Sequence, residues 1–180
     1  MTATNLAELY DVPTMSWAQV RERLDAGFSQ VPDADDAGPG PGRHSTWLTT
    51  LDADGSPHST ALGVLWHRDA FWFETGRRTR KGRNIARDPR CSLTLSVREF
   101  DLAVNGRAEL VTDRVVVAEL ARLWAAEGWP CEVDESGTAL TAPFSAQSAG
   151  RPPWHVYRID ATSAVAVQTV EPGGATRWTF

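Results

Sequence analysis

The densest cluster of basic side chains in the sequence lies in the segment Arg77–Arg90. Seven of its fourteen residues are basic, and they include Lys81, the only lysine of the chain beside 17 arginines. Thr79 is placed to cap a short helix, so that Arg80, Lys81 and Gly82 form its first turn. A first turn carries unpaired backbone N–H groups and a partial positive charge. With a hydroxyl, a guanidinium and an ammonium group added, the segment predicts a phosphate-binding site.

Two other roles fit a run of basic residues, a solvated helix face and a surface that binds nucleic acid or polyphosphate. The chain as a whole is acidic, with a formal net charge of -5. The basic run contains no aromatic side chain on which a base could stack. One local basic cluster in an acidic chain favours a small anion, and we expect no nucleic-acid partner.

The elements that must position this cluster are mainly strands. Ser16–Ala26 is predicted as a helix with a Ser16–Gln19 capping box, and Pro32–Arg43 as a Gly/Pro-rich linker. An Asp-Gly turn joins two of the expected strands. We expect strands at Thr46–Leu51, Pro57–Trp66, Phe71–Phe73, Cys91–Val97, Phe100–Val111, Trp154–Ile159, Ala164–Thr169 and Thr176–Phe180, helices at Thr79–Arg87 and from Asp113 to Ala126, and a loop at Trp129–Gly150.

This order predicts a mainly β fold, a small antiparallel barrel with helices packed outside it. We divide the chain into a helical arm with its linker, residues 1–43, and a barrel domain, residues 44–180. On the second helix, a stripe of Val116, Leu120, Leu123 and Trp124 is expected to face the core.

The remaining composition excludes several classes of protein. No stretch approaches the roughly 20 apolar residues of a membrane-spanning helix, and the N-terminus lacks the features of a secretory signal, so we expect a cytoplasmic protein.

Two cysteines do not form a disulfide framework. Cys91 opens an apolar run and is expected to be buried, whereas Cys131 lies in a loop and is expected to be exposed. The four histidines lack metal-ligand spacing, so we expect no metal site: His44, His58, His67 and His155.

Four segments, in the right order, resemble the pyridoxamine 5'-phosphate oxidase-like split barrels, which include flavin and deazaflavin oxidoreductases. The signature runs from Phe71-Trp-Phe-Glu-Thr through Thr79-Arg-Lys and Asn84-Ile to Asp88-Pro-Arg. The other three segments are the hairpin Thr46–Trp66, Val104–Glu109 and Pro152–Ile159. The resemblance covers about residues 44–180 and implies a split β-barrel.

The resemblance also implies a cofactor site. In that family the Ser/Thr-Arg-Lys element holds the cofactor phosphate, which implies Thr79, Arg80 and Lys81, together with Thr75 and Asn84 of the same signature. The second strand of the hairpin lines the ring system, which implies His58, Ser59, Thr60, Ala61 and Leu62. Trp154 and Tyr157 would wall the pocket from the partner subunit of a homodimer. The implied cofactor is the deazaflavin coenzyme F420 or FMN.

Several of these residues also have an ordinary structural interpretation. His58 fits a surface histidine beside a turn, and Trp66 and Trp72 fit the core. Trp154 fits core packing and a pocket wall equally well. Arg158 is expected to form a structural ion pair.

One departure from the family narrows the expected reaction. The C-terminal Arg-x-His-x-Arg run that grips substrate in the vitamin-processing oxidase is absent, which argues against oxidation of pyridoxamine or pyridoxine 5'-phosphate. The excess of arginine over lysine favours the actinobacterial deazaflavin-dependent branch. We therefore expect an oxidoreductase that transfers a hydride between its cofactor and a small unsaturated substrate. Because no proton donor can be picked from the sequence, a non-catalytic carrier or sensor is the alternative.

Overall fold

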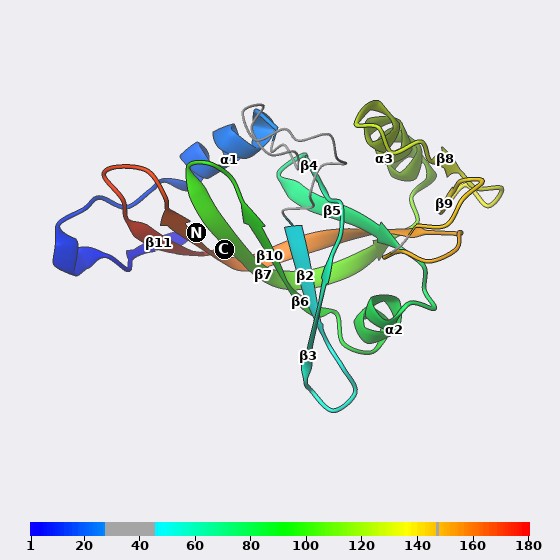
Figure 1. Ribbon diagram of the computed structural model, residues 1–180, viewed down its shortest axis with the longest axis horizontal. Coiled ribbons are helices and arrows are strands. Elements are labelled where there is room, and N and C mark those ends of the chain that lie inside the picture. The colour runs from blue at the N-terminus through cyan, green and yellow to red at the C-terminus, as the bar shows by residue number, and fades with distance from the viewer. Residues whose placement is uncertain (28–45, 147) are drawn as a thin grey trace, which may run out of the picture.

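The computed structural model describes residues 1–27, 46–146 and 148–180, and most of this part of the chain is antiparallel sheet (Figure 1). The main sheet runs in the order β1-β11-β10-β7-β6-β2-β3, while β5 pairs with both β4 and β10. Its strands are β1 (Thr2–Asn5), β2 (Thr46–Leu51), β3 (Pro57–Ala61), β4 (Leu65–His67), β5 (Ala70–Thr75), β6 (Arg90–Ser96), β7 (Phe100–Val111), β10 (His155–Gln168) and β11 (Ala175–Thr179). The predicted mainly β class is confirmed.

The predicted linker Pro32–Arg43 and the domain boundary after residue 43 lie outside the described residues. The segment before them contains more than the expected helix. Strand β1 pairs with β11 at the edge of the main sheet. Helix α1 (Trp17–Asp25) has the predicted capping box at Ser16, and its buried Val20 and Leu24 join the core of the barrel.

Strand β10 is where the sheet divides. We expected two strands here, Trp154–Ile159 and Ala164–Thr169, and this prediction is wrong because the chain continues through a bulge between Ala161 and Ser163. On one edge β10 pairs with β7 over its whole length. On the other edge it pairs with β5 before the bulge and with β11 after it. The bulge therefore lets one strand serve two branches of the sheet.

Gly106 allows β7 and β10 to approach beside this bulge. A Cβ atom added at Gly106 would lie 2.2 Å from the carbonyl oxygen of Asp160. No side chain fits such a distance, so only glycine permits the pairing of Gly106 with Ala161.

The hairpin β2–β3 closes through the predicted Asp-Gly turn, with Gly55 at a φ of 84°. The expected strand Pro57–Trp66 is, however, two strands. Strand β3 ends at Ala61, and Leu62 and Val64, which follow it, bury their side chains in the barrel. The chain resumes as β4, which pairs with β5.

Two further helices lie outside the sheet, α2 (Arg80–Arg87) and α3 (Arg114–Ala126). The predicted cap Asp113 accepts hydrogen bonds from the backbone N–H groups of Val115 and Val116. The buried face of α3 is rotated from the expected stripe, because Val117 and Ala121 are buried beside Leu120 and Trp124, while Val116 and Leu123 are only partly buried. A short 3-10 helix, Glu8–Tyr10, follows β1. Among the described residues no helix is long and apolar enough to cross a membrane.

The core has two clusters. The larger fills the barrel and includes Cys91, as predicted. The smaller lies between α3 and the outer face of β5 and β10, where Trp72 is buried and Trp154 has no exposed surface. Cys131, expected to be exposed, is buried in this second cluster, because the loop that carries it packs on α3 and its thiol lies 3.9 Å from the carbonyl oxygen of Ala121. The expected loop also contains a small hairpin, β8 (Glu132–Val133) and β9 (Leu140–Thr141).

Candidate functional site

The N-terminus of α2 is held by threonines. The hydroxyl of Thr79 accepts a hydrogen bond from the backbone N–H of Gly82 at 3.1 Å and donates to the carbonyl of Gly76 at 2.8 Å. The hydroxyl of Thr75, at the end of β5, lies 3.0 Å from the same Thr79 oxygen. The predicted cap is therefore confirmed, and it ties the helix to the strand that precedes it.

The first turn of α2 keeps free donors. Among the described residues, the backbone N–H groups of Arg80 and Lys81 find no acceptor. Gly82 is required behind them, because a Cβ atom there would lie 2.4 Å from the carbonyl oxygen of Gly76. The close β5–α2 turn thus exposes two unpaired N–H groups at the positive end of the helix dipole.

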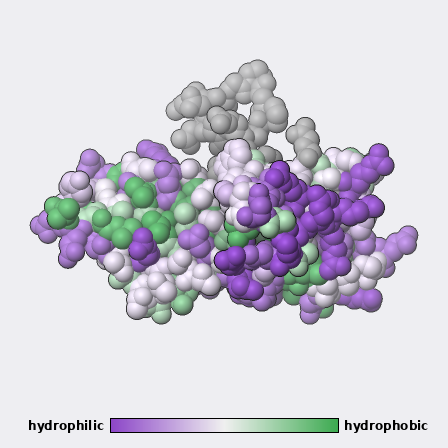
Figure 2. Space-filling view, turned by 90° about the horizontal axis from the view of Figure 1, so that it is seen from below, coloured by the Kyte–Doolittle hydropathy of each residue, from purple (hydrophilic) through white to green (hydrophobic). Residues whose placement is uncertain are grey.

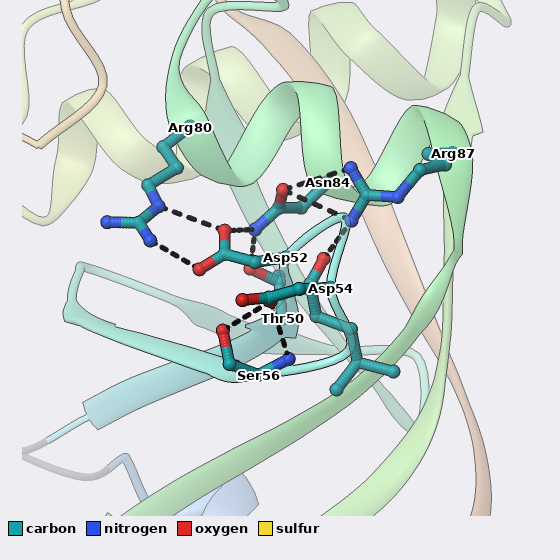
Figure 3. A network of polar contacts seen from close by, with 8 residues as sticks. Thr50, Asp52, Asp54, Ser56, Arg80, Asn84 and Arg87 are labelled. Carbon is teal, nitrogen blue, oxygen red and sulfur yellow. Dashed lines mark hydrogen bonds and ion pairs between the residues drawn. The ribbon is translucent and has the colours of Figure 1, made fainter.

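Arg80 forms an ion pair with Asp52, in the turn between β2 and β3 (Figure 3). Its Nε donates to one carboxylate oxygen at 2.9 Å, and a terminal nitrogen donates to the other oxygen. Asn84, one helical turn later, also donates to Asp52, at 3.0 Å. The hydrogen bonds from Arg80 and then from Asn84 lower the pKa of Asp52 to about 2.

Two further contacts dock α2 on the hairpin. The amide of Asn84 donates to the hydroxyl of Thr50 at 3.1 Å, and Arg87 donates to the carbonyl of Leu51. Exposed arginines cover the outer side of the helix at positions 80, 83 and 87. Figure 2, which views the molecule from this side, shows hydrophilic residues gathered over one half of the face.

Lys81 points into the protein, where only 3% of its surface is exposed. Its ammonium group donates to the carbonyl of Ser148. An ammonium has three N–H donors, and the described residues provide no second hydrogen-bond acceptor for it. Burial lowers the pKa of Lys81, and the nearby Glu74 opposes this shift.

Glu74 projects from β5 on the same side. One of its carboxylate oxygens is buried and has no hydrogen-bond partner among the described residues. Burial raises the pKa of Glu74 to about 8, although the charge of Lys81 acts against the increase. At neutral pH the carboxyl group is therefore mostly protonated, and it leaves the positive charge of Lys81 largely uncompensated.

The expected ring-lining residues lie at the open edge of the sheet. Within the described part of the chain β3 pairs only with β2, and the hydroxyl of Ser59 lies 2.7 Å from that of Thr49. His58, Thr60 and Ala61 are partly buried, and Nδ1 of His58 is buried with no partner in the part of the chain that the structure describes. Leu62 lies beyond the strand, inside the core.

The structure does not bring Trp154 and Tyr157 to the first turn of α2. Trp154 is fully buried in the second cluster, where its indole N–H donates to the carbonyl of Gly150 at 3.0 Å. Tyr157 stacks on Phe73 inside the barrel, with ring centroids 5.2 Å apart. Within one chain Trp154 acts in packing, whereas the side chain of Tyr157 also hydrogen-bonds to Arg77, just ahead of α2. Arg158 forms the expected ion pair, with Asp160.

Sequence reasoning missed the residues that hold the basic cluster in place: Thr50, Asp52, Glu74, Arg87 and Ser148. Asp52 could have been suspected, because a carboxylate in a turn is a natural partner for one of many arginines. Nothing in the sequence pairs Ser148 with Lys81. No group of three or more His, Cys, Asp or Glu side chains among the described residues is placed to hold a metal ion.

Comparison with known proteins assigns the family. The family model for pyridoxamine 5'-phosphate oxidase matches residues 41–168, and no curated protein matches. A conserved hypothetical protein, Rv2991 from Mycobacterium tuberculosis, is 22% identical with a TM-score of 0.56, covering 84% of this chain and 83% of the other. A pyridoxamine 5'-phosphate oxidase-related, FMN binding protein from Nostoc punctiforme is 15% identical with a TM-score of 0.52, covering 74% and 79%.

These structural likenesses concern the fold, and they agree with the split barrel that the sequence predicted and the divided sheet that β10 creates. The family match spans the hairpin β2–β3, the signature from β5 through α2, and all of β10. The chain belongs to the pyridoxamine 5'-phosphate oxidase family, in its split-barrel fold.

Proposed function

We propose that this chain binds FMN or the deazaflavin coenzyme F420 through the phosphate and transfers a hydride between that cofactor and a small unsaturated substrate. The observation that carries the proposal is the set of unfilled donors at the first turn of α2. Among the described residues, two backbone N–H groups lack acceptors there, and the ammonium of Lys81 has a single acceptor, the carbonyl of Ser148, for its three N–H donors. Phosphate oxygens would satisfy all of them.

The charge of the site supports the same ligand. Lys81 is buried, and the carboxyl group beside it has a raised pKa, so the ammonium has little compensation within the chain. A buried cation without a counter-ion is costly, and a bound anion removes that cost. Arg80, on the exposed side of the same turn, adds a second cation.

The chain's own part in the reaction is to bind, orient and exclude water, while a bound flavin or deazaflavin supplies the redox chemistry. Thr79, Arg80 and Lys81 would hold the phosphate, with Thr75 and Asn84 fixing the helix that carries them. The open edge of β3, from His58 to Ala61, would offer backbone groups to the ring edge.

The test is a set of fluorescence titrations with FMN, F420 and riboflavin, which has the ring of FMN without its phosphate. We expect FMN or F420 to bind, and FMN to bind more tightly than riboflavin because only FMN reaches the donors of α2. Equal binding of FMN and riboflavin would contradict the phosphate site. Cofactor binding without turnover of any reductant or acceptor would leave the non-catalytic carrier or sensor as the function.

We further propose a homodimer, in line with the expected second subunit at the cofactor pocket. Trp154 and Tyr157 are buried inside their own chain, so neither side chain offers a surface to a cofactor bound at the proposed site. The pocket beside β3 would then need residues from a second copy. Sedimentation should give a dimer when the cofactor is bound, and a cofactor-loaded monomer would contradict the proposal.

A further inference from the structure

The guanidinium of Arg80 is already bound by an anion of its own chain. Asp52 engages two of its nitrogens in a paired contact, the arrangement that arginine also uses to bind phosphate. Asp52 is well enclosed, with 14% of its side chain exposed, whereas Arg80 is 60% exposed. The carboxylate is therefore the enclosed partner of the pair, and the guanidinium is the partner that solvent and ligands can reach.

Asp52 ties Arg80 to the turn between β2 and β3. Asp52 also accepts a hydrogen bond from Asn84, one turn further along α2 (Figure 3). A phosphate bound to the backbone N–H groups of Arg80 and Lys81 would lie ahead of the first turn. The guanidinium must leave Asp52 to reach it, or must hold two anions close to one another.

We propose that Asp52 is an internal competitor for Arg80, a carboxylate that occupies the guanidinium until the phosphate of a ligand displaces it. The inference rests on the proposed function and adds to it a residue that sets the affinity. An arginine–carboxylate pair whose guanidinium is mostly exposed is weak enough for a dianion to break. A ligand that must first break it binds less tightly than it would to a free arginine. The contact therefore keeps the ligand exchangeable.

The test compares the wild type with Asp52→Asn by calorimetric titration of FMN and riboflavin. Asparagine keeps the size of the side chain and a carbonyl oxygen for Asn84, and it removes the charge. We expect FMN to bind about three- to tenfold more tightly to the variant, since the competing pair and the repulsion between two anions are both lost. Riboflavin binding should not change.

Asp54→Asn is the matched control. Asp54 lies in the same turn and carries the same charge, but its carboxylate accepts hydrogen bonds from Ser56. Its replacement should change FMN binding by less than about twofold, because only a screened charge is lost. In a protein that already carries Arg80→Ala, Asp52→Asn should not tighten FMN binding, since the guanidinium for which Asp52 competes is absent.

The outcomes separate this inference from the proposed function. If Asp52→Asn binds FMN more tightly than the wild type does and Asp54→Asn does not, Asp52 acts as a competitor for Arg80. This holds even where the wild type binds FMN weakly. FMN bound more tightly than riboflavin by the wild type, with no gain or a loss in Asp52→Asn, overturns the role of Asp52 and leaves the phosphate site standing. FMN and riboflavin bound equally by both proteins overturns the phosphate site and the competitor together.

Discussion

Glu74→Gln is expected to make the protein more stable above about pH 5, and increasingly so up to about pH 8. The folded state buries the carboxyl group of Glu74, and its pKa rises from 4.5 to about 8 because burial disfavours the charged form. The unfolded chain ionises near the ordinary value. Between the two pKa values the unfolded state therefore binds fewer protons than the folded state.

The sign of the effect follows from this difference. Below about pH 4.5 both states are protonated at Glu74, and the wild type has its full stability from this group. As the pH rises toward 8, the unfolded state gains from ionisation while the folded state does not, so the free energy of unfolding falls. Glutamine cannot ionise, and the variant escapes this loss. The difference should approach the order of 3 kcal/mol at pH 8, after relaxation of the site is allowed for.

Urea denaturation of both proteins from pH 4 to pH 9 measures the difference directly. Glu132→Gln, at an exposed position in β8, is the matched control and should leave the pH dependence as it is in the wild type. Parallel curves for the wild type and Glu74→Gln would mean that Glu74 is ionised in the folded protein. It would then be a full partner of Lys81, and the argument that Lys81 lacks a counter-ion would fail.

The sequence predicted well what depends on local patterns. The caps Ser16, Thr79 and Asp113 were identified because each places a side-chain acceptor three residues or fewer before a backbone N–H group. The Asp-Gly turn and the alternating strands β6 and β7 follow from equally local signals. These features gave the mainly β class and a small antiparallel barrel, and the family resemblance added that the barrel is split.

What could not be predicted depends on contacts between distant segments. The sequence predicted two strands where β10 passes through a bulge, and across this bulge the core positions change from Tyr157 and Ile159 to Ala164 and Ala166, which are out of phase with them. The burial of Cys131 depends on where its loop packs against α3. At the candidate site, the sequence named the basic residues, but it could not assign Asp52 to Arg80 or Ser148 to Lys81, which are separated by 28 and 67 positions.

Lys81→Ala is expected to weaken FMN binding by about 1.5–3 kcal/mol, the usual worth of a hydrogen bond to a charged group. Lys81 is the only buried cation at the first turn of α2, among the residues that the structure describes. Its position away from solvent makes its attraction for a phosphate stronger than that of an exposed arginine. Riboflavin, which has no phosphate, should bind equally to both proteins.

Two further variants separate the charge of Lys81 from its packing. Arg83→Ala removes an exposed positive charge from the same helix and should leave FMN binding nearly unchanged. Lys81→Met keeps an unbranched chain in the buried space but cannot donate to Ser148, and it should lose as much FMN affinity as alanine does. If FMN binds to both Lys81 variants as it does to the wild type, the ammonium serves only to hold the Ser148 segment. The phosphate would then have to be bound by the backbone groups and Arg80 without it.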